Sequence, residues 1–206
     1  MDLTFYISAF VTLFVIIDPI GLAPLFVAIT QGMTAAERRA IGLRAAAVAM
    51  GLLTLFGLLG EAVLGFVGIS MPAFRIAGGI LLFLTALDML FERRTRRRED
   101  QADDHRPDPS VFPLATPLIA GPGAMATMIL LAGQVRGDPA ALVLIHLVMA
   151  VVMGLVLVMF LSAGLLERAL GKTGTNVITR LLGMLLAALS VQFVIDGLTN
   201  LPLAPL

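Results

Sequence analysis

The sequence predicts an all-α membrane protein, a polytopic bundle of about six helices arranged as two inverted three-helix repeats with helices one and four broken. Three observations predict it: long apolar runs, an uneven distribution of basic residues among the loops, and related motifs in the two halves. Of 206 residues, 59% are hydrophobic and 14% are charged, and the mean hydropathy is +0.99. Soluble domains are usually about 45–50% apolar with about 25% charge.

The apolar residues lie in runs long enough for a helix to cross a bilayer, which takes about 20 residues. Lipid offers no hydrogen bonds to the backbone, so each run must be helical. We expect the first run to remain as a span, because Asp2 stands where a signal peptide has basic residues. The expected spans are Leu3–Thr30, Ile41–Phe66, Phe74–Phe91, Val111–Ala132, Ala140–Leu166 and Asn176–Leu198.

Basic residues favour one side of the membrane. If six spans alternate in direction, the loops after spans one, three and five share a side, and only Arg75 and Arg136 fall on the other. Cytoplasmic loops are enriched in Lys and Arg. We therefore expect a multi-pass protein of the cell (inner) membrane with both termini outside the cytoplasm. The twelve basic residues of the cytoplasmic side are Arg38, Arg39, Arg44, Arg93, Arg94, Arg96, Arg97, Arg98, Arg106, Arg168, Lys172 and Arg180.

A charged segment divides the chain near its middle. Residues 92–110 contain both signs of charge, prolines and almost no apolar residues, so they cannot form a core of their own. We interpret them as a solvated cytoplasmic loop between a first three-span repeat, residues 1–91, and a second, inverted repeat, residues 111–206. The alternative is a regulatory or lipid-binding role for the arginines of the loop.

The first pair of related motifs contains proline and glycine. Residues 16–26 read IIDPIGLAPLF and residues 119–129 read IAGPGAMATMI, so Asp18-Pro19 lies opposite Gly121-Pro122, 103 residues further on. A second pair follows in the same order. Residues 75–85 (RIAGGILLFLT) resemble residues 180–190 (RLLGMLLAALS), with Gly78 opposite Gly183 at a separation of 105.

Three spans per half is an odd number, so two copies of the unit must cross the membrane in opposite senses. Inverted repeats of this kind are common among transporters. The alternative is low-complexity repetition of leucine and alanine.

Proline and glycine cluster in the middle of spans one and four, which predicts that both helices are broken. Proline removes a backbone donor and displaces the residue before it from helical geometry. Pro24 is expected in the first turn of a restarted helix. A restarted helix presents free N–H groups that suit an anion, and matching breaks in two inverted halves indicate a binding site at the membrane midplane. The alternative is a pair of ordinary proline kinks.

Asp18 is the one carboxylate near the centre of a span. A charge there costs about 2.5–3.5 kcal/mol on insertion scales, so it must be paired, hydrated or protonated. Asp18 is therefore the candidate for coupling to protons, and the equal alternative is that it caps the restarted helix. The full set of candidate substrate-binding residues is Asp18, Pro19, Gly21, Pro24, Thr116, Gly121, Pro122, Gly123 and Thr127.

The composition argues against enzymatic chemistry. Cysteine is absent and only two histidines are present, and the sequence contains neither an HExxH motif nor a P-loop. We expect no enzyme activity, no cofactor and no metal. Fourteen basic residues balance fourteen acidic ones, and no nucleic-acid partner is expected.

Several motifs resemble the MarC family of integral membrane proteins: DPIGLAPLF, GISMPAFRIAGGILLF, PLIAGPGAM and TRLLGMLLAALSVQFVIDGL. The resemblance covers the chain except for the charged loop. It implies a six-span inner-membrane protein, and some members are exporters or proton-coupled transporters of small neutral amino acids such as alanine and glycine. It also implies roles for the proline and glycine residues of both breaks. Where relatives have Asn-Pro this chain has Asp18-Pro19, and where many have asparagine it has Leu22.

The leading hypothesis is a secondary transporter of small neutral amino acids, working as an exporter or a proton-coupled carrier. Its partners would be a small-molecule solute, the lipid bilayer and protons. A passive channel, an exporter of another solute, and a membrane scaffold or regulator acting through the charged loop remain alternatives. The sequence leaves open whether the chain forms a homo-oligomer.

Overall fold

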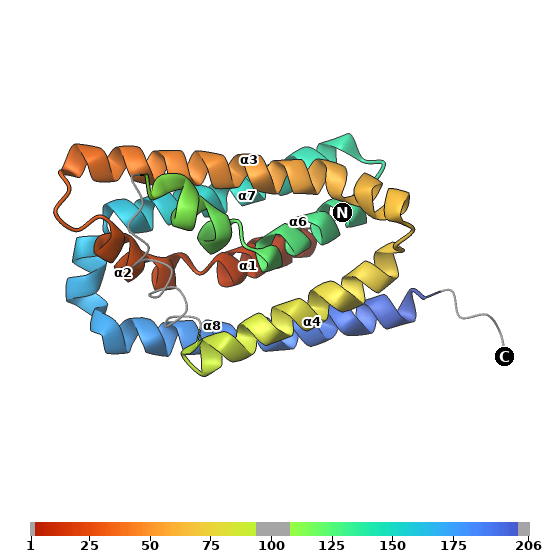
Figure 1. Cartoon of the computed structure of the whole chain (residues 1–206). Helices are drawn as coiled ribbons and strands as arrows, with labels where there is room; N and C mark the ends of the chain where they lie inside the picture. The colour runs from red at the N-terminus through yellow and green to blue at the C-terminus, as the bar shows by residue number, and fades with distance from the viewer. Residues whose placement is uncertain (1–2, 94–107, 202–206) are drawn as a thin grey trace.

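The computed structural model describes residues 3–93 and 108–201, and within these residues the chain is helical without strands (Figure 1). Most of the predicted linker, residues 94–107 of the 92–110 segment, lies outside the described residues. The elements are α1 (Leu3–Ile17), α2 (Pro19–Ile29), α3 (Ala35–Val67), α4 (Met71–Leu90), the π-helical segment η1 (Ser110–Ile119), α6 (Pro122–Gln134), α7 (Pro139–Leu161) and α8 (Ala163–Thr199).

The prediction of about six spans is confirmed. Five helices are long and apolar enough to cross a bilayer, and the pair η1 and α6, bent by 59°, adds a sixth if it counts as one span. The predicted start of the second span is too late. Its helix begins at Ala35 rather than Ile41, because a capping box extends it through charged residues: Glu37 Oε2 accepts from the Thr34 N–H at 2.7 Å, and the Glu37 N–H donates to Thr34 Oγ1 at 3.3 Å. The sixth predicted span, Asn176–Leu198, agrees with the apolar segment Thr173–Thr199 of α8, a helix that starts at Ala163 and bends at Gly171.

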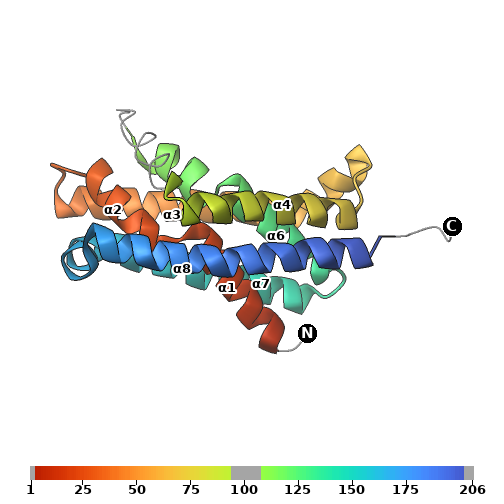
Figure 2. The ribbon, with the colours of Figure 1, turned by 90° about the horizontal axis from the view of Figure 1, so that it is seen from below.

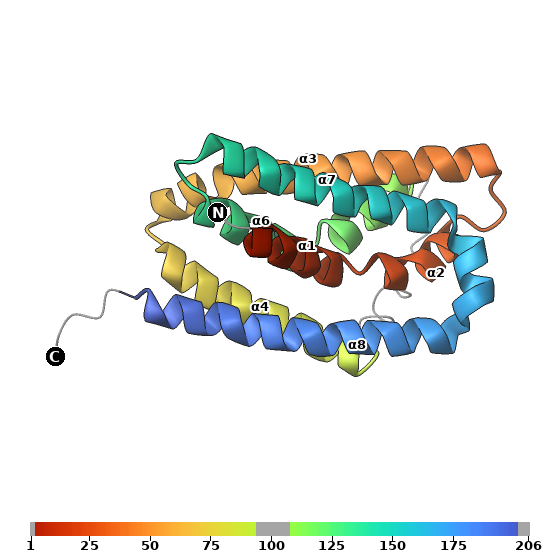
Figure 3. The same cartoon turned by 180° about the vertical axis from the view of Figure 1, so that it is seen from behind.

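The spans form three layers (Figures 1 and 3). The layer α3/α7 lies on one side, α4/α8 on the other, and α1–α2 with η1–α6 fills the space between them. In the α1–α2 span, 61% of the most apolar window is buried within the chain, against 22–28% for the other four continuous spans. The α1–α2 span therefore lies inside the protein, and the other four spans leave most of their surface exposed.

The two halves of the chain are interleaved. The first span packs mainly on α7 and α8 of the second half, and η1–α6 packs mainly on α3 and α4 of the first half. Each half thus supplies the central element that the outer helices of the other half cover. Neither half has a complete core of its own.

Helix α4 and the part of α8 that follows Gly171 lie antiparallel and in contact, as Figure 2 shows. Glycine permits this approach. A Cβ atom on Gly79 would lie 2.8 Å from the backbone oxygen of Ser190, and one on Gly183 would lie 2.9 Å from Met89 Cβ and 3.3 Å from the Ala86 oxygen. Small residues let helices approach closely in membranes, where van der Waals packing drives association.

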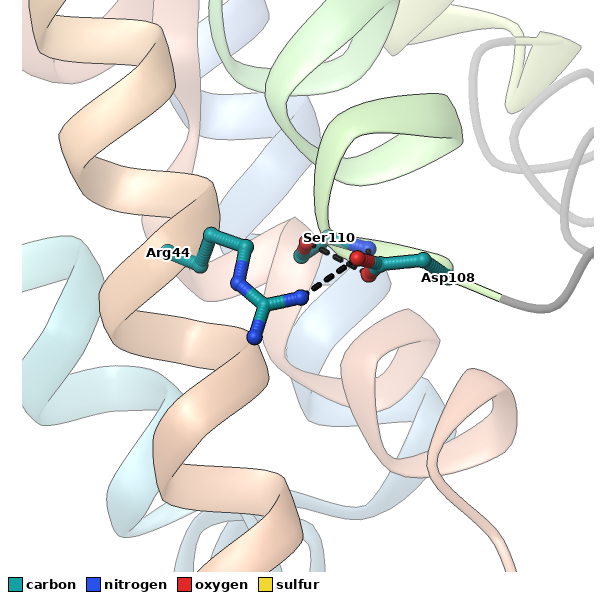
Figure 4. Close-up of polar contacts among 3 residues, drawn as sticks. All are labelled: Arg44, Asp108 and Ser110. Carbon is teal, nitrogen blue, oxygen red and sulfur yellow. Dashed lines mark hydrogen bonds and ion pairs between the residues drawn. The ribbon is translucent and has the colours of Figure 1, made fainter.

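An ion pair fixes the end of the linker to α3 (Figure 4). Asp108 Oδ1 accepts hydrogen bonds from the Ser110 N–H at 3.0 Å and from the Ser110 hydroxyl at 2.6 Å. Arg44 Nη1 lies 2.5 Å from the second carboxylate oxygen, Asp108 Oδ2. The Ser110 hydrogen bonds, followed by the Arg44 charge, lower the pKa of Asp108 below its ordinary value. The contact sets where η1 begins.

Replacing Gly79 with alanine should destabilise the bundle by about 1–3 kcal/mol, because the new methyl group would overlap backbone atoms of α8. Thermal unfolding in detergent measures the effect. The matched control is Gly154→Ala in α7, where a Cβ would meet nothing within 4 Å. This control should be neutral or stabilising by up to about 1 kcal/mol, as expected for alanine in a helix. Equal unfolding temperatures for the two variants would contradict the close approach of α4 and α8.

Asp108→Asn should lower stability by about 1 kcal/mol or less at pH 7, because the pair with Arg44 is partly exposed and screened by solvent. The pKa of Asp108 is lowered in the folded state, so its stabilising effect is complete above the unfolded value of about 3.9 and disappears as the pH falls through the folded value. The stability difference between the parent and the variant should therefore shrink steadily as the pH falls below about 4. A difference that stays constant from pH 7 down through this range would rule out this origin.

Candidate functional site

The first span is interrupted at Asp18. Helix α1 ends at Ile17, Asp18 adopts left-handed geometry with φ 57° and ψ 64°, and α2 begins at Pro19. Proline disfavours helical geometry at the residue before it, and aspartate is among the few non-glycine residues that visit the left-handed region. The Asp18 N–H still donates to the Phe14 oxygen at 2.9 Å. The helix is thus interrupted at one residue, while backbone hydrogen bonds continue on either side.

Asp18 caps the helix that follows it. Its Oδ1 accepts from the Gly21 N–H at 3.1 Å, and the residue is fully buried. A Cβ on Gly21 would lie 2.1 Å from Asp18 Oδ2, so the carboxylate needs glycine at this place. Of the two roles considered for Asp18, the geometry confirms capping. Contact with a solute or a proton remains a prediction.

The expected position of Pro24 is wrong. Pro24 lies inside α2, and Pro19 occupies the first turn. The physical reason is the Asp18 cap, which starts the helix one turn earlier than the second proline alone would indicate. Proline at the first helical position costs no hydrogen bond, because that N–H has no partner within the helix.

The fourth span changes direction between η1 and α6. In η1 the backbone is extended at Phe112 and Thr116, and the Ala120 N–H donates to the Ala115 oxygen five residues back at 2.8 Å. Gly121 is extended with φ −80° and ψ 170°, and a Cβ there would lie 2.6 Å from the Pro117 oxygen. Helix α6 begins at Pro122, and no side chain caps it.

The two interruptions touch each other in the middle layer. A Cβ on Gly123 would lie 2.9 Å from Ile16 Cδ1, so the start of α6 packs against the end of α1 next to Asp18. Thr127 is fully buried and donates to the Gly123 oxygen at 2.8 Å, which ties its hydroxyl to its own helix. The Thr116 Oγ1 is buried and has no hydrogen-bond partner within the part of the chain that the structure describes.

The remaining candidates differ in exposure. Pro19 and Gly123 are buried, Gly21, Pro24 and Gly121 are half-buried, and Pro122 is exposed. The structure therefore brings the backbones of both interruptions together without enclosing every candidate side chain. Among residues 3–93 and 108–201, no group of acidic residues and histidines could hold a metal ion.

In the part of the chain that the structure describes, two of the cavities lie at opposite ends of the bundle, and neither is lined by any of the nine candidates. The larger, about 570 Å³, lies between the first turns of α3 and the junction of α7 with α8. The smaller, about 270 Å³, contains Glu61 and Arg136, which form an ion pair. Sequence reasoning missed both. The adjacent arginines Arg38 and Arg39 were a local signal for the larger cavity. The smaller cavity had no such signal, because Glu61 and Arg136 are 75 residues apart in the sequence.

These features define the chain as an integral membrane protein of the polytopic helical class. Residues 3–201 match the MarC family integral membrane proteins, and the chain belongs to that family.

Relatives match the chain over nearly its full length. The UPF0056 membrane protein MJ1677 of Methanocaldococcus jannaschii is 36% identical, with 96% of this chain and 98% of that protein covered. The UPF0056 membrane protein YvbG of Bacillus subtilis is 37% identical, with 98% and 97% covered. The UPF0056 inner membrane protein YhgN of Escherichia coli is 34% identical, with 93% and 95% covered. No solved structure matches the chain.

Asp18→Asn should fold with nearly the parent stability, because asparagine tolerates left-handed geometry and its side-chain oxygen can accept from the Gly21 N–H. Asp18→Ala should lose about 0.5–2 kcal/mol through loss of the cap. Thermal unfolding of both variants in detergent compares them. Equal losses in the two variants would mean that the hydrogen bond to Gly21 does not stabilise α2.

Proposed function

We propose that the chain is a secondary transporter, an exporter or proton-coupled carrier, of small neutral amino acids such as alanine or glycine. The observation that supports this most directly is the fully buried Asp18 at a helix restart in the central layer. Ionisable groups within membrane spans usually belong to solute or proton pathways. The proposed site lies where the interruptions at Asp18 and Gly121 meet.

The inverted repeat is part of the proposal, and the two helix restarts support it. Both α2 and α6 begin with proline, at Pro19 and Pro122. The first helical bond in each joins equivalent residues: the Leu22 N–H donates to the Asp18 oxygen at 3.0 Å, and the Met125 N–H donates to the Gly121 oxygen at 3.0 Å. The two donor residues are 103 residues apart, and so are the two acceptor residues, which is the spacing of the sequence motifs.

The α4–α8 contact supports the same symmetry. Gly79 meets the Ser190 oxygen and Val194, while Gly183 meets the Ala86 oxygen and Leu90. Adding 104 to Gly79, Ala86 and Leu90 gives Gly183, Ser190 and Val194, so each glycine makes the contacts of the other. Such reciprocal contacts are what a two-fold axis between the two halves would produce. They pair Gly79 with Gly183, whereas the sequence motifs pair the neighbouring Gly78 with Gly183.

The chemistry of the two restarts suits a zwitterion. The first N–H groups of α6 lie at the positive end of the helix dipole with no side-chain cap, an arrangement that favours a carboxylate. The Asp18 carboxylate and the Thr116 hydroxyl are the polar groups proposed for the ammonium end. The close packing of Gly123 against Ile16 would restrict the solute to a short side chain. We further propose that both termini lie outside the cytoplasm, following the positive-inside rule.

Purified protein in liposomes should take up labelled alanine or glycine by saturable counterflow, and an imposed pH gradient should drive accumulation. Asp18→Asn should keep the counterflow at a higher half-saturating solute concentration and lose the accumulation, because asparagine preserves the cap and a neutral acceptor for the ammonium group but cannot bind a proton. Radiolabel uptake with and without the gradient separates the two activities.

The matched control is Asp196→Asn, which removes a carboxylate from the exposed end of α8, where Asp196 accepts a hydrogen bond from Gln192. It should behave as the parent. Uptake no greater than in protein-free vesicles would end the amino-acid proposal. Unitary conductance without saturation would favour a channel. Accumulation that survives in Asp18→Asn would remove Asp18 from the coupling step.

A further inference from the structure

We infer that the larger cavity is a binding site for an anionic phospholipid, with the phosphodiester held by Arg38 and Arg39 and an acyl chain along Leu161 and Leu165. The cavity has a volume of about 570 Å³ and opens between α3 and the α7–α8 junction. This site is separate from the interruptions at Asp18 and Gly121 and does not depend on the proposed transport activity.

The position of the cavity along the membrane normal matches the lipid headgroups. Helix α3 has 33 residues, so it is about 50 Å long, whereas the hydrocarbon core of a bilayer is about 30 Å thick. Its ends must therefore reach the headgroup layer, and Ala35, Arg38 and Arg39 of its first turns line the cavity. On the other wall, the start of α8 before the bend at Gly171 runs across the end of the bundle (Figures 1 and 3).

The polar groups of the cavity favour an anion. The Arg38 Nε donates to the Thr30 oxygen at 3.3 Å, which fixes the side chain. Among the residues described by the structure, neither Arg38 nor Arg39 forms an ion pair with a carboxylate. The nearby Glu37 is engaged in the capping box with Thr34, whose hydroxyl donates to Glu37 Oε2 at 2.7 Å. Two guanidinium charges therefore remain for an external partner.

The start of α8 adds backbone donors. Ala163 and Gly164 line the cavity. The Ser162 hydroxyl donates back to the Val158 oxygen at 2.6 Å, so no side chain caps α8. The free N–H groups of a helix start attract phosphate oxygens. Guanidinium groups and helix-terminal N–H groups on opposite walls together suit a phosphodiester.

The apolar part of the lining distinguishes a lipid from a free anion. Leu161 is 53% exposed and Leu165 is 71% exposed beside the charged groups. Phe160 is buried behind them and stacks on Phe26 at 4.3 Å between ring centroids, which makes the wall rigid. Inorganic phosphate would make no use of exposed leucine, whereas an acyl chain would cover it. Basic pockets between membrane helices on the cytoplasmic side bind anionic lipid headgroups in this way.

A single introduced tryptophan tests the site, because the chain has none of its own. Leu165→Trp places the reporter at the cavity, in vesicles of phosphatidylcholine containing a small fraction of brominated phosphatidylglycerol. Quenching should show a preference for the brominated anionic lipid on the order of tenfold over its bulk fraction. Arg38→Gln with Arg39→Gln should abolish the preference, and Arg38→Lys with Arg39→Lys should keep most of it.

Two controls separate this site from general surface charge. Arg180→Gln removes a charge near the same end, where Arg180 pairs with Glu92 at 2.7 Å, and should leave the preference unchanged. A reporter at Val143→Trp, 59% exposed near the opposite end of α7, should show no preference in the parent. Equal quenching by both lipids, a preference that survives the double glutamine variant, or an equal loss in Arg180→Gln would each overturn the proposal. Displacement by millimolar inorganic phosphate would overturn the lipid in favour of a small anion.

Discussion

A backbone that leaves helical geometry at membrane depth must find partners for its polar groups inside the protein, because lipid supplies none. This constraint accounts for the three-layer arrangement. The two interrupted segments, α1–α2 and η1–α6, occupy the central layer, and the continuous helices α3, α7, α4 and α8 cover them. At the first interruption the Asp18 carboxylate replaces the missing backbone acceptor for the Gly21 N–H. A protein with six regular helices would have no need for such a layer.

The interleaving of the halves follows from the same constraint. A half with one interrupted and two continuous spans cannot cover its own interrupted backbone on both sides, and the first span lies against α7 and α8 instead. The contact between α4 and α8 then closes the bundle, and it requires glycine because a Cβ on Gly79 would lie 2.8 Å from a backbone oxygen of the other helix. The fold is therefore a property of the whole chain.

The sequence predicted those features that depend on neighbouring residues. Apolar runs located the spans, and Asp18-Pro19 and Gly121-Pro122 located the restarts of α2 and α6. The sequence-based prediction failed where two local signals compete. Hydropathy places the start of the second span after the charged residues, at Ile41, whereas helix propensity and the Thr34 cap place the start of α3 at Ala35. The sequence could not predict the Arg44–Asp108 pair, whose members are 64 residues apart. Neither could it reveal a cavity, which exists only once helices are packed.

The two restarts share a proline at the first helical position and an equivalent first helical hydrogen bond but differ in charge, and this difference bears on the kind of solute that the proposed site would take. Asp18 places a carboxylate over the first turn of α2, so that helix start already has an acceptor. Gly121, its counterpart, has no side chain, and the first donors of α6 are left without a cap. A site made from these two ends would offer an acceptor on one side and donors on the other. An inorganic ion would pair with either the acceptor or the donors and leave the other group unpaired at membrane depth. A zwitterion would pair with both. This is the physical reason for proposing an amino acid over a simple anion or cation.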